Sequence, residues 1–321
     1  MRRVTSNQFA NNAMWKFADM ISNKLILLVI TILLARLITP EAYGIVALTT
    51  VFIAFSDIFI LNGFNIALIR KETVDKIDYS TVTAMSLIFT VFMYLIFFVA
   101  APHIANFYKS PDLCLVLRVI TILLFFKSIV SVIRAKGTRE LQFKRIVLSA
   151  FISNFSAGII AIVLAYMGWG IWALVFQQVL AGFFDMLVMM ILFRWHLSLK
   201  YSSSVAKGMF KFTAGVIGTS FLDFLGNNIC GLIIGKSYST KDLGYYNRAN
   251  MFPETIGLNV YNSINSVLLP TFASLQNNED DMKRVTRKVM SLTEYIIFPM
   301  MFGLIGVANV LIPVLLTDAG G

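Results

Sequence analysis

Polar residues follow a helical spacing near the start of the chain. Four of them are separated by four, three and four positions, which places them on one helical face: Asn12, Lys16, Asp19 and Asn23. Lys24 lies beside this face, and the apolar stretch 25–35 that follows is only about 16 Å long as a helix, too short for a hydrocarbon core of about 30 Å. We therefore expect the polar half to line a water-filled cavity. The alternative is an interfacial helix start in which Lys16 and Asp19 pair.

Three further apolar segments carry polar stripes. In the first, Gln178 and Asp185 are seven residues apart and so lie on the same side of a helix. In each of the other two, the polar residues share one helical face. These residues are Ser220, Asp223 and Asn227 in one segment, and Arg248, Thr255, Asn259, Asn262 and Ser266 in the other. An ionisable group inside a membrane costs about 2.5–3.5 kcal/mol, so such groups normally face a cavity or a partner. Four stripes predict a helical bundle around a hydrophilic lumen. The alternative is that they form hydrogen bonds between helices, worth about 0.6 kcal/mol each.

Signatures of catalysis and metal binding are absent from the sequence. It has no GxSxG, HExxH, Walker or dinucleotide-binding glycine pattern. Two cysteines and two histidines are isolated from one another, whereas a zinc site needs three or four converging ligands: Cys114, Cys230, His103 and His196. We expect no catalytic residue, no metal and no cofactor, and hence no enzyme. A membrane-embedded glycosyl transfer enzyme that uses Asp57 or Asp223 is the remaining enzymatic alternative.

The composition is that of an integral membrane protein. Of the 321 residues 58% are hydrophobic and 14% are charged, against about 45–50% and 25% in ordinary soluble proteins. Segments long and apolar enough to span a membrane predict an all-α polytopic membrane protein with about nine transmembrane helices. Their approximate ranges are 13–37, 42–63, 80–101, 113–133, 146–167, 170–193, 212–235, 244–269 and 289–315.

The positive charges are distributed unevenly between alternate loops. The net charge is +10, and eighteen of the 27 Lys and Arg residues lie in the N-terminus and every second loop, against four in the opposite loops. Cytoplasmic loops carry such an excess, so we expect a cytoplasmic N-terminus. Nucleic-acid binding would not produce this alternation, and we expect no nucleic-acid partner. Lys127 lies close enough to the cytoplasmic end of its span to snorkel, and Arg118 either lines the lumen or snorkels outward.

Two short segments echo each other. Residues 39–44 read TPEAYG and residues 239–244 read STKDLG; each follows a long apolar segment, begins with a hydroxyl residue and ends in glycine. The offset of 200 residues corresponds to six predicted spans. Internal repeats of this kind occur in many transporters, whose substrate sites lie between the repeats.

At these positions the chain resembles a known family. LARLITPEAYGIVAL, GKSYSTKDLGYYNRANMF and LLPTFASLQ are similar to the polysaccharide-transporter branch of the multidrug/oligosaccharidyl-lipid/polysaccharide exporter superfamily, the Wzx-type flippases. The resemblance implies two pseudo-symmetric six-helix lobes, a complete one in residues 1–200 and an incomplete one in residues 201–321. It also implies export of an oligosaccharide repeat unit linked to undecaprenyl diphosphate across a bacterial inner membrane, by alternating access of a cationic cavity. Polysaccharide polymerase and assembly proteins are possible partners.

This resemblance assigns roles to the polar residues. Arg248, then Lys24, then Arg118 are the candidates to hold the diphosphate, and three more residues extend the substrate-binding set: Lys16, Asn227 and Asn259. Four acids are candidates for a coupling proton or sodium ion, with neutralisation of a lumen cation as the alternative: Asp57, Asp223, Asp19 and Asp185. For Arg248 the alternatives are pairing with a nearby acid or snorkelling.

The chain ends just after the ninth predicted span, so the second lobe would have half of its helices. We expect either a fragment or a chain that a partner completes. Two other functions stay open. One is a cation-coupled multidrug exporter, which would favour a more apolar or acidic pocket. The other is a scaffold of a polysaccharide assembly complex that transports nothing.

Overall fold

The computed structural model describes most of the chain. The described residues are 29–63, 65, 68, 71, 74–196, 198–251, 253–255, 257, 260 and 279–316. Four predicted site residues lie outside them: Lys16, Asp19, Lys24 and Asn259. The described chain is helical and has no strand, which confirms an all-α polytopic protein. It divides into two compact units, Met1–Gly244 and Tyr245–Gly321. The predicted lobe boundary at residue 200 stays a prediction.

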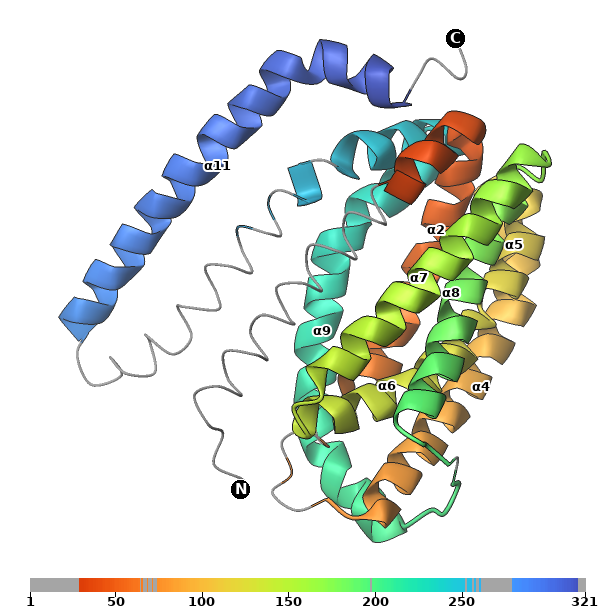
Figure 1. Cartoon of the computed structure of the whole chain (residues 1–321), viewed down its shortest axis with the longest axis vertical. Helices are drawn as coiled ribbons and strands as arrows, with labels where there is room; N and C mark the ends of the chain where they lie inside the picture. Colours follow the sequence, from red (N-terminus) through yellow and green to blue (C-terminus); the bar gives the residue numbers. More distant parts are fainter. Residues whose placement is uncertain are drawn as a thin grey trace. The chain divides into compact units, whose positions relative to one another are not determined.

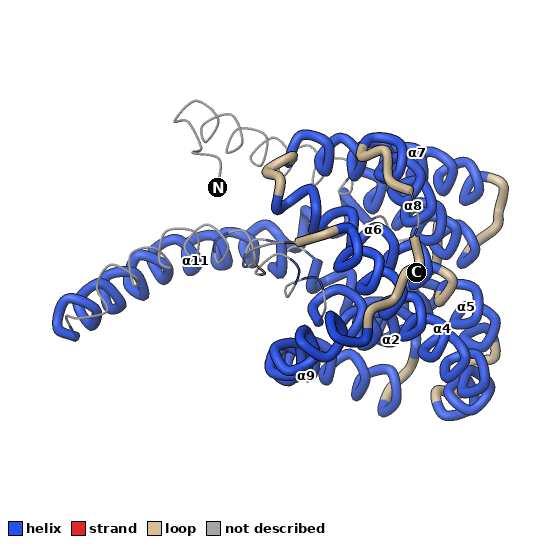
Figure 2. Tube along the Cα trace, turned by 90° about the horizontal axis from the view of Figure 1, so that it is seen from below, coloured by secondary structure: helices blue, strands red, loops and turns tan. Residues whose placement is uncertain are grey.

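The first unit is a bundle of helices joined, in its described part, by short connections (Figures 1 and 2). After helical residues 29–37, its elements are α2 (Pro40–Asp57), the π-helical η1 (Ile58–Gly63), α4 (Lys76–Phe107), α5 (Asp112–Ile120), α6 (Leu123–Arg139), α7 (Phe143–Tyr166), α8 (Ile171–Leu192) and α9 (Ser203–Ser237). The second unit contains the end of the helical segment 240–251 and α11 (Glu279–Leu316).

Seven helical stretches of the described chain are long and apolar enough to cross a membrane. They correspond to the second to seventh and the ninth predicted spans; most of the first and half of the eighth lie outside the described residues. The fourth predicted span consists of two helices, because the regular α-helix is interrupted between the end of α5 at Ile120 and the start of α6 at Leu123. There the Thr121 hydroxyl donates to the Leu117 carbonyl oxygen at 2.8 Å, a bond that competes with the regular helical pattern.

Local sequence explains where the helices begin and end. Pro40 occupies the first turn of α2, where its missing N–H costs nothing, and Thr39 caps that turn. At the start of α4 the Asp78 carboxylate accepts a hydrogen bond from the Asp75 backbone N–H at 2.9 Å. The connection between α7 and α8 contains Gly168 and Gly170, both at positive φ, which glycine adopts without steric cost.

Small and apolar residues pack the bundle. α7 and α8 lie side by side (Figure 1), and small buried residues permit their close approach: Ala157, Ala161, Ala165 and Ala173. On the outside of α4, exposed apolar side chains recur every three to four residues, as expected of a surface in contact with lipid: Ile88, Val91, Phe92, Leu95 and Val99. The interior and the perimeter are therefore both apolar, which suits a membrane-embedded bundle.

The two segments that echo each other in sequence touch in the structure. A Cβ atom on Gly44 would overlap the carbonyl oxygen of Thr240 and lie 3.1 Å from the backbone nitrogen of Gly244. A Cβ atom on Gly244 would overlap the carbonyl oxygen of Pro40 and lie 3.2 Å from the backbone nitrogen of Gly44. The contact is therefore reciprocal and is made by backbone on both sides.

The caps of these two segments also correspond. The Thr39 hydroxyl accepts a hydrogen bond from the Ala42 backbone N–H at 3.4 Å, and the Ser239 hydroxyl accepts one from the Asp242 backbone N–H at 3.0 Å. Each hydroxyl residue thus begins a helix that carries its glycine into the contact. Segments 200 residues apart have the same local structure and meet as equivalents.

Candidate functional site

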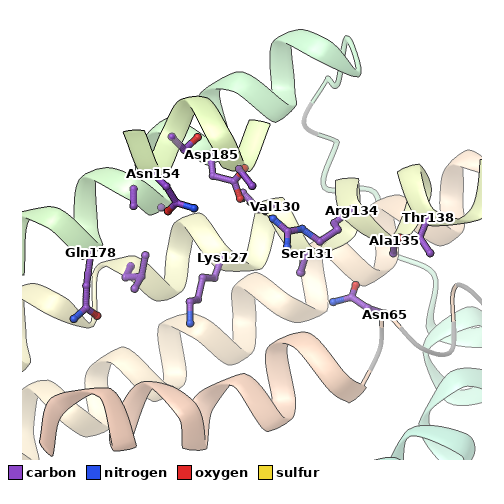
Figure 3. A pocket seen from close by; sticks show the side chains of 15 residues that line it. Asn65, Lys127, Val130, Ser131, Arg134, Ala135, Thr138, Asn154, Gln178 and Asp185 are labelled. Carbon is purple, nitrogen blue, oxygen red and sulfur yellow. Dashed lines mark hydrogen bonds and ion pairs between the residues drawn. The ribbon is translucent and has the colours of Figure 1, made fainter. Parts of the chain in front are cut away.

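The first unit contains a cavity of about 630 Å³ whose wall combines apolar residues with charged and polar side chains (Figure 3). Helices α6, α7 and α8 supply most of its wall, and Asn65 approaches from the chain after η1. The lining residues are Asn65, Leu123, Lys127, Val130, Ser131, Arg134, Ala135, Thr138, Ala150, Ser153, Asn154, Gln178, Ala181, Gly182 and Asp185.

Helix α6 supplies the positive side of the cavity. Lys127 and Arg134 are seven residues apart, which places them on the same face about 10 Å apart along the helix axis. Ser131 lies between them on that face and also lines the cavity. A single helical face therefore presents two cations and a hydroxyl group to one space.

Arg134 forms an ion pair across the cavity. One of its terminal nitrogens lies 3.0 Å from Asp185 Oδ2 on α8 (Figure 3). The Ser149 hydroxyl of α7 donates to Asp185 Oδ1 at 2.5 Å, so both carboxylate oxygens are engaged. The Arg134 side chain is 46% exposed and the Asp185 side chain 16%. The carboxylate thus holds one edge of the guanidinium, which carries five N–H donors in total.

Lys127 forms the second ion pair, with the last residue of α2. Its Nζ lies 2.6 Å from Asp57 Oδ2. Asp57 Oδ1 is buried, and within the described part of the chain no group donates a hydrogen bond to it. The π-helical turn η1 begins directly after Asp57, and such turns frequently occur at functional sites.

Neutral polar groups complete the lining. The hydroxyls of Ser131 and Ser153 donate to backbone carbonyl oxygens of their own helices, at 2.8 and 2.7 Å. The amides of Asn154 and Gln178 line the cavity from α7 and α8, and the Asn65 amide donates to the Ile60 carbonyl oxygen at 3.1 Å. Amides offer both donors and acceptors, which suits sugar hydroxyls, whereas the two cations suit an anionic group.

Metal binding finds no support in the part of the chain that the structure describes. No group of three or more His, Cys, Asp or Glu residues there could hold a metal ion. The charged and amide side chains of the lining can recognise charged groups and hydroxyl groups.

The structure brings two predicted candidates to this region. Asp185 lines the cavity, and Asp57 pairs with the cavity residue Lys127. In both cases the carboxylate neutralises a cation, which is the alternative role considered for these acids. Their role as coupling-ion sites stays a prediction.

The other described candidates lie outside the cavity lining. Arg118 lies over the Phe98 ring, 4.3 Å from its centroid, and its Nε donates to the Phe98 carbonyl oxygen at 3.3 Å. Asp223 and Asn227 are exposed on α9. Arg248 is half-buried in the second unit, which is a separate compact unit. Their roles stay predictions: contact with substrate for Arg118, Asn227 and Arg248, and binding of a coupling ion for Asp223.

Sequence reasoning missed the two cations of α6 as site residues. Lys127 was expected to snorkel, but its ammonium pairs with Asp57 instead. Arg134 lies one residue beyond the predicted span 113–133 and so belonged to the following loop, whereas α6 extends to Arg139. The available signal was the spacing of Lys127, Ser131 and Arg134, which repeats the four-and-three pattern of the predicted polar stripes.

The chain is similar in sequence to known proteins of polysaccharide biosynthesis. The chain is 24% identical over 277 residues to the succinoglycan biosynthesis transport protein ExoT of Rhizobium meliloti, covering 86% of this chain and 56% of that protein. It is 24% identical over 261 residues to the teichuronic acid biosynthesis protein TuaB of Bacillus subtilis, covering 80% and 54%. It is 23% identical over 295 residues to the lipopolysaccharide biosynthesis protein WzxC of Escherichia coli, covering 87% and 57%.

The chain spans little more than half the length of these curated relatives. No solved structure matches it. The model of the family described as polysaccharide biosynthesis protein matches residues 33–319, which is most of the chain and includes both echo segments and every helix that lines the cavity. The resemblance inferred from those segments is thereby confirmed, and the chain belongs to this polysaccharide biosynthesis family.

Proposed function

We propose that the protein exports a polysaccharide precursor across the cytoplasmic membrane of a bacterium, as an oligosaccharide repeat unit linked to a lipid diphosphate. Membrane-spanning helices and relatives named as transport and biosynthesis proteins for three surface polysaccharides support this proposal. The cargo moves by alternating access of a cationic cavity. This activity is proposed for the whole protein, because the chain matches little more than half of its relatives.

The observation that carries the proposal is the cavity lined by Lys127, Arg134 and three amide side chains. A diphosphate brings negative charge into a membrane, and fixed cations offset the loss of its hydration. The amides of Asn154 and Gln178 suit the sugar hydroxyls next to it.

The size of the cavity limits how much of the cargo it holds. About 630 Å³ falls within the range of about 300–1,000 Å³ that encloses a drug-sized ligand. That is enough for a diphosphate with one or two sugars and too little for a long lipid chain. We infer that the cavity takes the charged head group while the lipid remains in the bilayer.

The charge distribution suggests how this cavity is loaded. Lys136 and Arg139 occupy the last turn of α6, at the same end of the helix as Arg134. With a cytoplasmic N-terminus, this end of α6 faces the cytoplasm. The anionic head group would then enter from the side on which it is synthesised.

A flipping assay on the whole natural protein tests the proposal. The protein is reconstituted in vesicles with a fluorescent lipid diphosphate oligosaccharide, and the fraction of lipid that crosses is measured by chemical quenching. Removal of both cations together with their acids, in K127Q/D57N/R134Q/D185N, avoids leaving a buried charge unpaired. We expect flipping to fall at least about tenfold, the factor that 1.4 kcal/mol of lost interaction produces.

The matched control is K136Q, which changes a cation of the same helix that does not line the cavity. This variant should flip at the rate of the unmodified protein. Normal flipping by a correctly folded quadruple variant would refute the role of the cavity.

A further inference from the structure

We propose that Asp57 and the anionic head group compete for Lys127, so that protonation of Asp57 and binding of the anion favour each other. This inference rests on the proposed function, because it concerns the same cavity. It assigns unequal roles to the two ion pairs. Arg134 is a fixed part of the anion site, whereas Lys127 binds either Asp57 or the anion.

The Arg134 pair can accept an anion without breaking. Asp185 is held from two sides, by Arg134 at 3.0 Å and by the Ser149 hydroxyl at 2.5 Å. The guanidinium carries five donors in a rigid fork, and with 46% of its side chain exposed it keeps donors that face the cavity. An incoming phosphate would add to this pair and leave Asp185 in place.

The Lys127 pair is different. Its ammonium is a compact charge on a flexible stem, and it already lies 2.6 Å from Asp57 Oδ2. In Figure 3, Lys127 and Arg134 point in different directions from the same helix face. To reach a phosphate held by Arg134, the Lys127 side chain must swing along the cavity and give up much of its contact with Asp57.

The surroundings of Asp57 make that release costly while it is ionised. Its Oδ1 is buried and receives no hydrogen bond within the described residues, and its side chain is 18% exposed. A buried carboxylate that loses its one cation is strongly destabilised. A proton on Asp57 removes this cost and frees Lys127 at the same time.

Among the charged groups of the described elements packed against α2, Lys127 is the one that acts on Asp57. Of the described elements packed against α2, α6 contributes Lys127, which acts on Asp57 directly, and also Arg134, which pairs with Asp185 of α8. On α5, Arg118 lies over the Phe98 ring, and on α9, Asp223 is exposed. Lys127 is therefore the residue through which the protonation of Asp57 reaches the cavity.

The sign of the linkage follows. In an exchanger in which the coupling ion and the cargo bind to the same side chain, binding of one excludes binding of the other. Here the proton and the anion take opposite members of one ion pair, so each promotes the binding of the other by the same factor. Lower pH should therefore strengthen binding of the anion through Asp57.

Calorimetric titration of inorganic pyrophosphate into the whole protein in lipid nanodiscs, at pH 6 and pH 8, tests this linkage. Pyrophosphate itself titrates in this range, so the D57N variant supplies the baseline. At pH 8 we expect D57N to bind pyrophosphate about tenfold more tightly than the unmodified protein, within the usual range of coupling between linked sites. The difference in affinity between the unmodified protein and D57N should be smaller at pH 6 than at pH 8.

Further variants separate failure of the linkage from failure of the site. K127Q/D57N removes the shared pair without leaving a buried charge, and its affinity should change with pH only as much as that of D57N. R134Q/D185N should lose most of the binding if the cavity is the anion site. Equal affinities of D57N and unmodified protein at both pH values overturn the linkage alone. Unchanged pyrophosphate binding in R134Q/D185N overturns the proposed site and the linkage with it.

Discussion

The reciprocal contact of Gly44 and Gly244 gives a prediction that can be worked out from the structure. In Gly44→Ala the new methyl group would overlap the carbonyl oxygen of Thr240, and in Gly244→Ala it would overlap that of Pro40. Each obstacle is backbone, which cannot rotate away as a side chain can. The two segments must therefore move apart.

The cost can be bounded. Overpacking a close contact costs about 1–3 kcal/mol, of which Ala recovers about 0.5–1 kcal/mol through its better helix propensity than Gly. Because both substitutions separate the same two segments, the second one meets space that the first has opened. We expect the loss in G44A/G244A to be smaller than the sum of the two single losses by about 1 kcal/mol, a typical coupling for residues in contact.

Thermal unfolding of the purified protein in detergent, followed by tryptophan fluorescence, measures these effects. A loss of 1 kcal/mol lowers Tm by about 2–4 °C in a unit of 150–250 residues, so each single variant should melt several degrees lower. Gly218→Ala on α9 is the matched control, because a Cβ there meets nothing within 4 Å. It should melt at or slightly above the unmodified protein. If Gly44→Ala melts like Gly218→Ala, the backbone contact does not exist as described.

The ion pairs and turns give further predictions for the same melting assay. K127Q leaves Asp57 as a buried unpaired charge, so it should melt lower than K127Q/D57N, and the reverse order would contradict the pairing. Asp78 is 1% exposed and pairs with Lys71 at 2.7 Å, so D78N should lose about 1–3 kcal/mol, and an unchanged Tm would exclude this interaction. Gly168 has φ of 82°, so G168A should lose about 1 kcal/mol, and no loss would argue against that turn.

The sequence predicted the features that one helix determines by itself. Apolar length located seven described spans, and helical spacing correctly placed Gln178 and Asp185 on the cavity side of α8. The echo of residues 39–44 and 239–244 indicated equivalence because caps and glycines are local features. Each of these predictions depends on distances of a few residues along one chain segment.

The sequence could not predict partners across helices. Asp57 and Lys127 are 70 residues apart, and Arg134 and Asp185 are 51 apart, so no periodicity connects either pair. Spacing tells which face of a helix a residue occupies, and only packing tells which helix that face meets. The structure was therefore needed to identify which cation pairs with each acid that was predicted to face the lumen.

The error at Arg134 has a specific physical cause that extends to other membrane proteins. The predicted span ended at residue 133, where the apolar residues end, but α6 continues to Arg139. The helical hydrogen bonds of α6 continue past the last residue of the predicted span, so a cation in these extra turns keeps the direction that the helix gives it, unlike a cation on a loop. If such a cation is counted only toward the charge of a loop, the information about which face of the helix it occupies is lost. Arg134 adds to the positive charge at its end of α6 and also lines the cavity, because the helix does not stop where the apolar sequence does.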